Sequence, residues 1–171
     1  MAAINGWTDV FLQPGELYVG RADCRIRTVL GSCVSITLWH PRTCVGGMTH
    51  FMLPTRSSAT GDVRTLDGRY GDEALQMIFN QFNESGIPLS QCQGKIFGGG
   101  NMFASHLLAG VINVGQRNGE AARILLNEND ILIVSSCLFG VGHRQIIFDV
   151  SNGDVWSKQV KPGEPVRHGW G

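Results

Sequence analysis

Two stretches of alternating apolar and polar residues, joined by a short loop, constrain the fold of this chain more than any other feature. Residues 33–39 and 45–53 each place apolar side chains on one side, which is the pattern of half-buried β-strands. A hairpin with the four-residue loop His40–Thr43 makes Trp39 face Cys44. The buried face of this predicted hairpin consists of Val34, Ile36, Leu38, Val45, Phe51 and Leu53.

The opposite face of the hairpin brings a thiol to an imidazole. In the predicted register Cys33 lies directly across from His50, with their Cβ atoms about 5 Å apart. An imidazole at this distance can take the thiol proton and turn the cysteine into a nucleophile. Gly31 and Ser32 precede Cys33 in a turn whose backbone N–H groups can donate to an oxyanion. The alternative, a core cysteine and a hydrogen-bonded core histidine, stays open because a slip of one residue would separate the pair.

The remaining patterns indicate strands and helices in mixed order. Apolar residues recur at helical spacing after Gly71, with stop signals at Gly86 and Pro88, and a second helix is expected over 119–127. Strands are expected at 95–97, 145–150 and 155–160, and the apolar run 131–135 indicates a central strand. We therefore predict the α+β class, with a single domain whose centre holds mixed or antiparallel β-sheets and whose helices pack on the outside.

Charge and cysteine usage exclude several function classes. Lys and Arg together number 14, as do Asp and Glu, which leaves no net field to attract nucleic acid or an anionic membrane. The N-terminus lacks the pattern of a secretory signal and no apolar run approaches about 18 residues, so we predict a cytoplasmic protein without membrane insertion. Its 5 cysteines, none in a Cys-x-x-Cys pair, are then expected to be free thiols.

The sequence predicts neither a cofactor nor a metal. No Gly-Lys-Ser/Thr follows the glycines 98–100, which argues against a phosphate-binding loop and favours close packing of these glycines against the hairpin. The spacing of the other candidate ligands matches no usual zinc site: His40, Cys44, His106, His143 and His168.

Several ordered motifs resemble those of the chemoreceptor glutamine deamidases, the CheD family. They are Leu-Gly-Ser-Cys-Val at 30–34 with His50 seventeen positions after the cysteine, Gly-Arg-Tyr-x-Asp-x-Ala at 68–74, Gly-Gly-Gly-Asn-Met-Phe at 98–103, Asn-Val-Gly-Gln-Arg-Asn at 113–118, and His143-Arg144 before a Gly-Asp-Val-Trp hairpin. The resemblance covers roughly 14–160. It divides the chain into an N-terminal extension at 1–13, a CheD-like domain at 14–160 and a C-terminal tail at 161–171.

The resemblance implies a cysteine hydrolase, with a fold similar to that of the cysteine-hydrolase deamidase toxins. Such enzymes convert glutamine side chains of methyl-accepting chemotaxis receptors to glutamate and release ammonia, and some also hydrolyse glutamate methyl esters. Carried onto this chain, Cys33 is the nucleophile, His50 the general base and acid, and Thr28 the residue that orients His50. In some relatives the threonine lies one position earlier, where this chain has Arg27.

Our candidates for oxyanion and substrate contacts surround these three residues. Arg117 and Arg144 are predicted to pair with acidic residues beside a target glutamine, with ordinary ion pairing as the alternative. Tyr70 and Met102 are predicted to line the cleft, with core packing as the alternative. The full set of oxyanion and substrate candidates is Gly31, Ser32, Tyr70, Gly98, Gly99, Gly100, Asn101, Met102 and Arg117.

The resemblance also implies partners. The substrate is the helical bundle of a chemotaxis receptor, and some relatives bind a CheC-type phosphatase. A non-catalytic module that binds receptors and such a phosphatase is therefore the alternative function. The segment 137–140, Cys-Leu-Phe-Gly, departs from relatives that often have an acidic residue and a Gly pair there, which bears on specificity.

Overall fold

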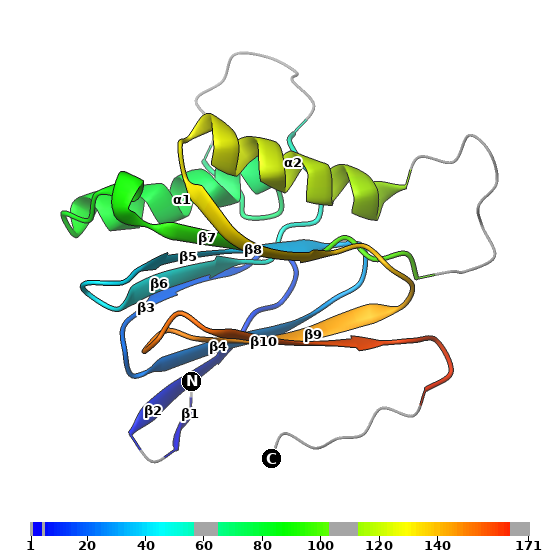
Figure 1. The fold of residues 1–171 in the computed structure, drawn as a ribbon, viewed down its shortest axis with the longest axis horizontal. Coiled ribbons are helices and arrows are strands. Elements are labelled where there is room, and N and C mark those ends of the chain that lie inside the picture. Colours follow the sequence, from blue (N-terminus) through cyan, green and yellow to red (C-terminus); the bar gives the residue numbers. More distant parts are fainter. Residues whose placement is uncertain (1, 5, 57–64, 103–112, 165–171) are drawn as a thin grey trace.

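Two β-sheets stack face to face, and helices α1 and α2 cover the outer side of one of them (Figure 1). This computed structural model describes residues 2–4, 6–56, 65–102 and 113–164. Within them, sheet A has the strand order β1-β2-β4-β9-β10, and sheet B, which lies next to the helices, has the order β3-β6-β5-β7-β8. The strands are β1 (Ala2–Ile4), β2 (Trp7–Phe11), β3 (Leu17–Gly20), β4 (Cys24–Leu30), β5 (Val34–His40), β6 (Val45–Thr49), β7 (Gln93–Gly98), β8 (Leu132–Leu138), β9 (His143–Asp149) and β10 (Val155–Val160).

The β5–β6 hairpin forms as expected, but in a register that differs by two residues from the prediction. His40 pairs with Val45, so the loop is Pro41–Cys44. His40 extends the ladder because its Nδ1 lies 2.8 Å from Thr43 Oγ1 inside the loop, and Cys44 closes the turn with a φ of +48°. An even shift preserves which side chains share a face.

Both faces of the hairpin are buried, since sheet B is the middle layer. The predicted apolar face packs against the helices and holds Val34, Ile36, Leu38, Val45 and Phe51. The other face packs against sheet A, where Met48 joins Ile26, Leu30, Ile146 and Phe148. The prediction was wrong for Leu53, which lies beyond the end of β6 and is 45% exposed.

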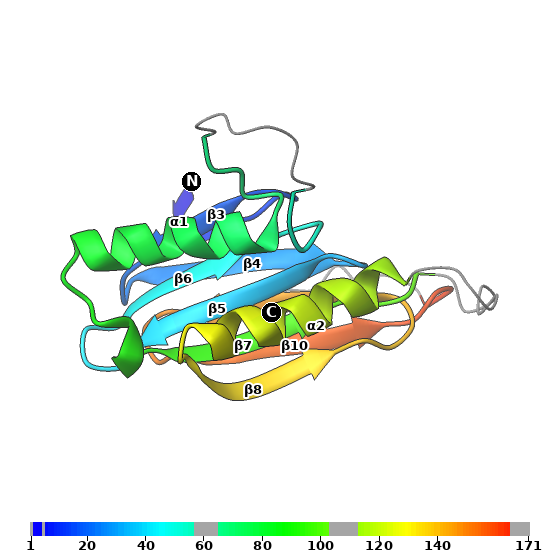
Figure 2. The same ribbon diagram turned by 90° about the horizontal axis from the view of Figure 1, so that it is seen from above.

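The helices are α1 (Gly71–Glu84) and α2 (Val114–Glu128), with a 3-10 turn at Leu89–Gln91. Figure 2 shows α1 above β3 and β6, and α2 above β5 and β7. The stripe of α1 that faces the sheet is apolar: Ala74, Leu75, Ile78, Phe79 and Phe82. Helix α2 begins five residues before the predicted start, because the Asn113 side chain caps it by accepting from Gln116 N–H at 3.1 Å.

The sheets contain parallel as well as antiparallel pairs, which confirms the α+β class with mixed sheets. β2 pairs with β4 in parallel, and β7 pairs with β8 in parallel. The expectation that residues 131–135 form a central strand was wrong. β8 lies at the edge of sheet B, and its Leu132 is 65% exposed. Residues 165–171 of the predicted tail lie outside the described residues.

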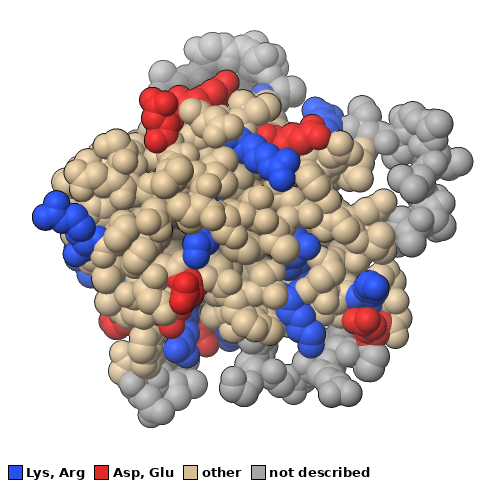
Figure 3. Space-filling view, viewed as in Figure 1, with Lys and Arg blue, Asp and Glu red and all other residues tan. Residues whose placement is uncertain are grey.

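Acidic and basic side chains are interspersed on the face of the molecule that Figure 3 shows. Neither helix in the described part of the chain is long and apolar enough to cross a membrane.

Leu38→Ala should lower the free energy of unfolding by about 2–5 kcal/mol, because Leu38 is fully buried in the middle layer and truncation leaves a cavity. Leu132→Ala is the matched control, and its effect should stay within about 0.5 kcal/mol because the side chain is exposed. Urea unfolding of both variants measures the difference. Equal losses would contradict the layer assignment.

Candidate active site

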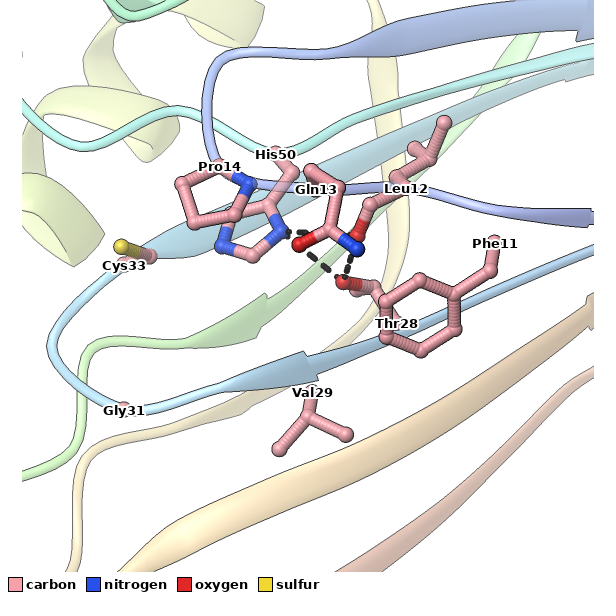
Figure 4. A pocket seen from close by; sticks show the side chains of 9 residues that line it. All are labelled: Phe11, Leu12, Gln13, Pro14, Thr28, Val29, Gly31, Cys33 and His50. Carbon is pink, nitrogen blue, oxygen red and sulfur yellow. Dashed lines mark hydrogen bonds between the residues drawn. The ribbon is translucent and has the colours of Figure 1, made fainter.

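The segment Gly31–Cys33 carries the chain from sheet A to sheet B. β4 ends at Leu30 in sheet A and β5 begins at Val34 in sheet B, so Cys33 lies where the two sheets join. Cys33 lines a pocket of about 280 Å³ together with Thr28 and His50 (Figure 4). The rest of the lining comes from the end of β2, the loop after it and the end of β4: Phe11, Leu12, Gln13, Pro14, Val29 and Gly31.

The glycine run Gly98–Gly100 packs against the backbone of this segment. The N–H of Gly99 donates to the Cys33 carbonyl at 2.9 Å, and the N–H of Gly100 donates to the Gly31 carbonyl at 2.8 Å. A Cβ on Gly98, whose φ is +112°, would lie 2.3 Å from the Cys33 carbonyl oxygen. The glycines therefore permit a backbone contact, and these two N–H groups are engaged by protein carbonyls.

His50 lies just past the end of β6 on the same face of the hairpin as Cys33. Between them, Val34 and Phe51 exchange backbone hydrogen bonds of 3.1 and 3.0 Å. Cys33 and His50 are therefore diagonal neighbours across the ladder, about 7–8 Å apart in regular geometry, rather than directly opposite as predicted. Both still line one pocket, because the two-residue shift leaves the faces unchanged.

The orientation of the His50 ring is fixed from the side away from Cys33 (Figure 4). Thr28 Oγ1 lies 2.7 Å from the Leu12 carbonyl and 2.8 Å from His50 Nδ1. A carbonyl only accepts, so the single hydroxyl proton goes to Leu12, and Thr28 must then accept a proton from Nδ1. His50 is therefore the Nδ1–H tautomer when neutral, and its Nε2 carries the lone pair.

Burial favours the neutral forms of both groups. Desolvation raises the pKa of the Cys33 thiol, and the hydrogen bond from the backbone N–H of the same residue opposes this rise. Desolvation lowers the pKa of His50, against smaller upward effects of the Leu12 carbonyl and the Glu16 carboxylate. The pocket therefore favours a neutral thiol and a neutral imidazole over an ion pair.

Three backbone N–H groups in the segment of the thiol have no backbone acceptor among the described residues. Within the part of the chain that the structure describes, the N–H groups of Gly31, Ser32 and Cys33 donate to no backbone carbonyl. Met102 lies over Gly31, where a Cβ would approach Met102 Sδ to 2.9 Å. A residue with a side chain would therefore collide with Met102 at this position. The arrangement can present N–H groups to a developing negative charge beside Sγ.

The other predicted contact residues lie at different distances from this pocket. Asn101 bridges to Val141, and Met102 is 40% exposed beside Gly31. Tyr70 precedes α1 and lies under the guanidinium of Arg56, with 5.0 Å between the Arg56 Cζ and the ring centroid. Arg117 is exposed on α2. The residues that line the pocket include none of these four, and among the other predicted contacts they include Gly31 but not Ser32 or the glycines 98–100.

Sequence reasoning gave no role to one buried side chain that supports the site, Asn118, and the wrong role to another, Arg144. Asn118 on α2 donates through Nδ2 to the Ser32 carbonyl at 3.0 Å and to the Met52 carbonyl at 2.8 Å. A signal was present, since Asn118 stands one helical turn before the buried Ala122 on an otherwise apolar stripe. The expectation for Arg144 was wrong. It is 6% exposed, and its guanidinium donates to the carbonyls of Cys137 and Phe139.

The described residues contain no group of three or more His, Cys, Asp or Glu that could hold a metal ion. Two of the histidines weighed as zinc ligands, His106 and His168, lie outside the described residues.

The chain is similar in sequence to proteins whose names state a function. The sequence model of a family described as CheD chemotactic sensory transduction matches residues 52–159. A probable chemoreceptor glutamine deamidase, CheD 2, of Albidiferax ferrireducens is 64% identical over 154 residues, which is 90% of this chain and 88% of that protein. A probable chemoreceptor glutamine deamidase, CheD 3, of Dechloromonas aromatica is 43% identical over 91% of this chain and 89% of that protein. Another, CheD 1 of Chromobacterium violaceum, is 41% identical over 91% of this chain and 79% of that protein.

The Albidiferax match includes Cys33 and His50, whereas the family match does not. The family match begins two residues after His50. The Albidiferax alignment, however, spans 154 of the 171 residues, a length that must include both Cys33 and His50.

At neutral pH, His50 should be the Nδ1–H tautomer in long-range proton–nitrogen NMR spectra, because Thr28 accepts from Nδ1. Thr28→Val should lower the population of the Nδ1–H tautomer, because it removes the acceptor at 2.8 Å and leaves the Leu12 carbonyl, whose 3.4 Å distance from Nδ1 gives a weaker hydrogen bond. Thr37→Val, at a buried threonine on β5, is the control and should leave the tautomer unchanged. An Nε2–H tautomer in the unaltered protein would contradict this geometry.

Proposed function

This chain belongs to the CheD family, and we propose that it hydrolyses the side-chain amide of glutamine residues in chemoreceptors. The observation that carries the proposal is the contact of Thr28 with His50 Nδ1 in the pocket that also holds Cys33. Thr28 and Leu12 hold Nδ1, so the basic Nε2 remains for the thiol of Cys33 in the same pocket. A buried imidazole needs hydrogen-bond partners in any role, so the proposal also depends on the other ring nitrogen, which lies on the side of Cys33 (Figure 4).

The proposed first step is attack on the amide. Cys33 Sγ adds to the carboxamide carbon while its proton passes to His50 Nε2. The N–H groups of Gly31, Ser32 and Cys33 stabilise the oxyanion of the tetrahedral adduct. His50 returns the proton to the amide nitrogen, and the carbon–nitrogen bond breaks. Ammonia departs, and a γ-glutamyl thioester remains on Cys33.

The second step releases the acid. His50 takes a proton from water, the hydroxide adds to the thioester carbon, and the same N–H groups stabilise the second oxyanion. The carbon–sulfur bond then breaks, sulfur regains the proton, and glutamate remains on the substrate. The net change is addition of water and loss of ammonia. A glutamate methyl ester would react by the same steps with methanol as the leaving group.

A protein substrate fits the surroundings of the pocket. Phe11 and Val29 line the pocket and are 39% and 37% exposed, and Met102 lies beside Gly31 at 40% exposure. Apolar side chains exposed next to a nucleophile are typical of a surface that another macromolecule covers. The helical bundle of a receptor is the partner that we propose, and its added negative charges would alter helix electrostatics. Because the mechanism needs a reduced thiol, the cytoplasm is the proposed location.

Cys33→Ser should abolish ammonia release from a purified receptor fragment, with a loss of at least about 10³-fold, because a serine hydroxyl is far less acidic than a thiol. Intact-mass spectrometry of the fragment should show a gain of about 1 Da per converted glutamine with the unaltered enzyme, the amide-to-acid difference of amide hydrolysis. Cys137→Ser, at an exposed cysteine outside the pocket, is the matched control and should remain active. Receptor binding without any mass change would favour the binding-module alternative and overturn the proposal.

The acid limb of kcat/KM should have its midpoint below 6.5. His50 must be neutral to accept the thiol proton, and burial lowers its pKa from the ordinary value of 6.5, so the base form persists at lower pH. Activity is therefore retained as the pH falls to 6.5 and is lost only below it. A pH–rate profile of ammonia release at low substrate concentration measures the midpoint. A midpoint above 6.5 would mean that an ion pair with the Cys33 thiolate holds the proton on His50.

A further inference from the structure

The carbonyls of the segment Gly31–Cys33 are all bound from outside the segment. Gly100 N–H binds the Gly31 carbonyl, and Gly99 N–H binds the Cys33 carbonyl. The carbonyl between them, that of Ser32, is bound by a side chain, the Nδ2 of Asn118 at 3.0 Å. The three carbonyls are thus fixed by donors, while the three N–H groups donate to no backbone carbonyl of the described chain.

The Ser32 carbonyl and the Cys33 N–H belong to the same peptide group. A trans peptide is planar, so its carbonyl and its N–H point in opposite directions. A donor that fixes the direction of the Ser32 carbonyl therefore also fixes the direction of the Cys33 N–H. That N–H belongs to the same residue as the thiol.

We infer that Asn118 is a positioning residue that aims the Cys33 N–H at the oxyanion by holding the Ser32 carbonyl. The inference rests on the proposed function for its biological meaning. The same amide also donates to the Met52 carbonyl at 2.8 Å, two residues after His50. One side chain thus ties the segment of the nucleophile to the segment of the base, from a helix on the outer side of sheet B.

The chemistry of its partners fixes which way the Asn118 amide points. Both partners are carbonyl oxygens, so the two N–H bonds of Nδ2 must face them. The Oδ1 atom is then buried and has no hydrogen-bond partner within the described residues. Asn118 is fully buried, and leaving an acceptor unpaired there is costly. A leucine of nearly the same shape would avoid that cost, which indicates that the two donors are what the position requires.

Two reactions of Cys33 test the inference without any receptor. Acylation by p-nitrophenyl acetate passes through a tetrahedral oxyanion, whereas alkylation by iodoacetamide displaces iodide and forms none. In Asn118→Leu, acylation of Cys33 should fall about 100-fold, the loss typical of one oxyanion donor, while alkylation should change by less than about threefold. Peptide mass mapping after each reaction assigns the label to Cys33.

The controls separate positioning from loss of fold. Asn118→Ala removes the same donors with a smaller side chain and should show the same fall in the ratio of acylation to alkylation. Asn113→Ala removes the cap of α2 but no donor to the pocket, and its ratio should match that of the unaltered protein. With a receptor fragment, Asn118→Leu should lower kcat and leave KM within about twofold.

The ratio decides the outcome. If acylation and alkylation fall together, or if both stay unchanged in a folded Asn118→Leu protein, the inference is overturned. Failure of the proposed function would look different, as an unaltered protein that releases no ammonia from receptors, and the ratio would remain measurable in it.

Discussion

The passage of the chain from sheet A to sheet B at Gly31–Cys33 is the constraint on which the rest of the site depends. A segment between two stacked sheets cannot complete its hydrogen bonds in either ladder, so its peptide groups need partners from elsewhere. Here the carbonyls receive them from Gly99, Gly100 and Asn118. The N–H groups of the same three residues donate to no backbone carbonyl of the described chain. The residues that we propose as nucleophile and oxyanion donors thus share one break in β-sheet hydrogen bonding.

This arrangement explains why the glycine run is close to the segment in space. Gly99 and Gly100 can donate to it because Gly98 and Gly100 have no Cβ. A Cβ would lie 2.3 Å from the Cys33 carbonyl oxygen at Gly98 and 2.7 Å from the Gly142 carbonyl oxygen at Gly100. Behind the run, the buried guanidinium of Arg144 donates to the carbonyls at the end of β8. The glycines allow two backbone segments to lie close together. The guanidinium of Arg144, which has five N–H donors, holds the residues at the end of β8 in place. The support therefore extends from sheet A, through β8, to the pocket.

The sequence was sufficient for the local elements and for placing Cys33 and His50 on one face of the hairpin, and insufficient for the contacts between layers. Alternation located β5 and β6, and helical spacing located α1, since both periodicities depend on neighbours in the chain. The same alternation could not give the register, which the His40–Thr43 contact sets inside the loop. It also could not place Leu12, because the N-terminal strand β2 reaches the pocket only through its parallel pairing with β4. The family resemblance named Thr28 and His50, while the carbonyl that fixes the proton between them belongs to this long-range pairing.

The two buried polar groups around the site are costly for the same reason that they are useful. Asn118 leaves Oδ1 unpaired, and Arg144 leaves Nε unpaired, among the described residues. Apolar side chains at both positions would pack without these costs, but they would release carbonyls whose direction determines where the neighbouring N–H groups point. An enzyme that stabilises an oxyanion with backbone groups has no side chain to adjust, so its precision must come from whatever holds the carbonyls. Asn118 thus carries one unpaired acceptor together with two hydrogen bonds that fix the Ser32 and Met52 carbonyls.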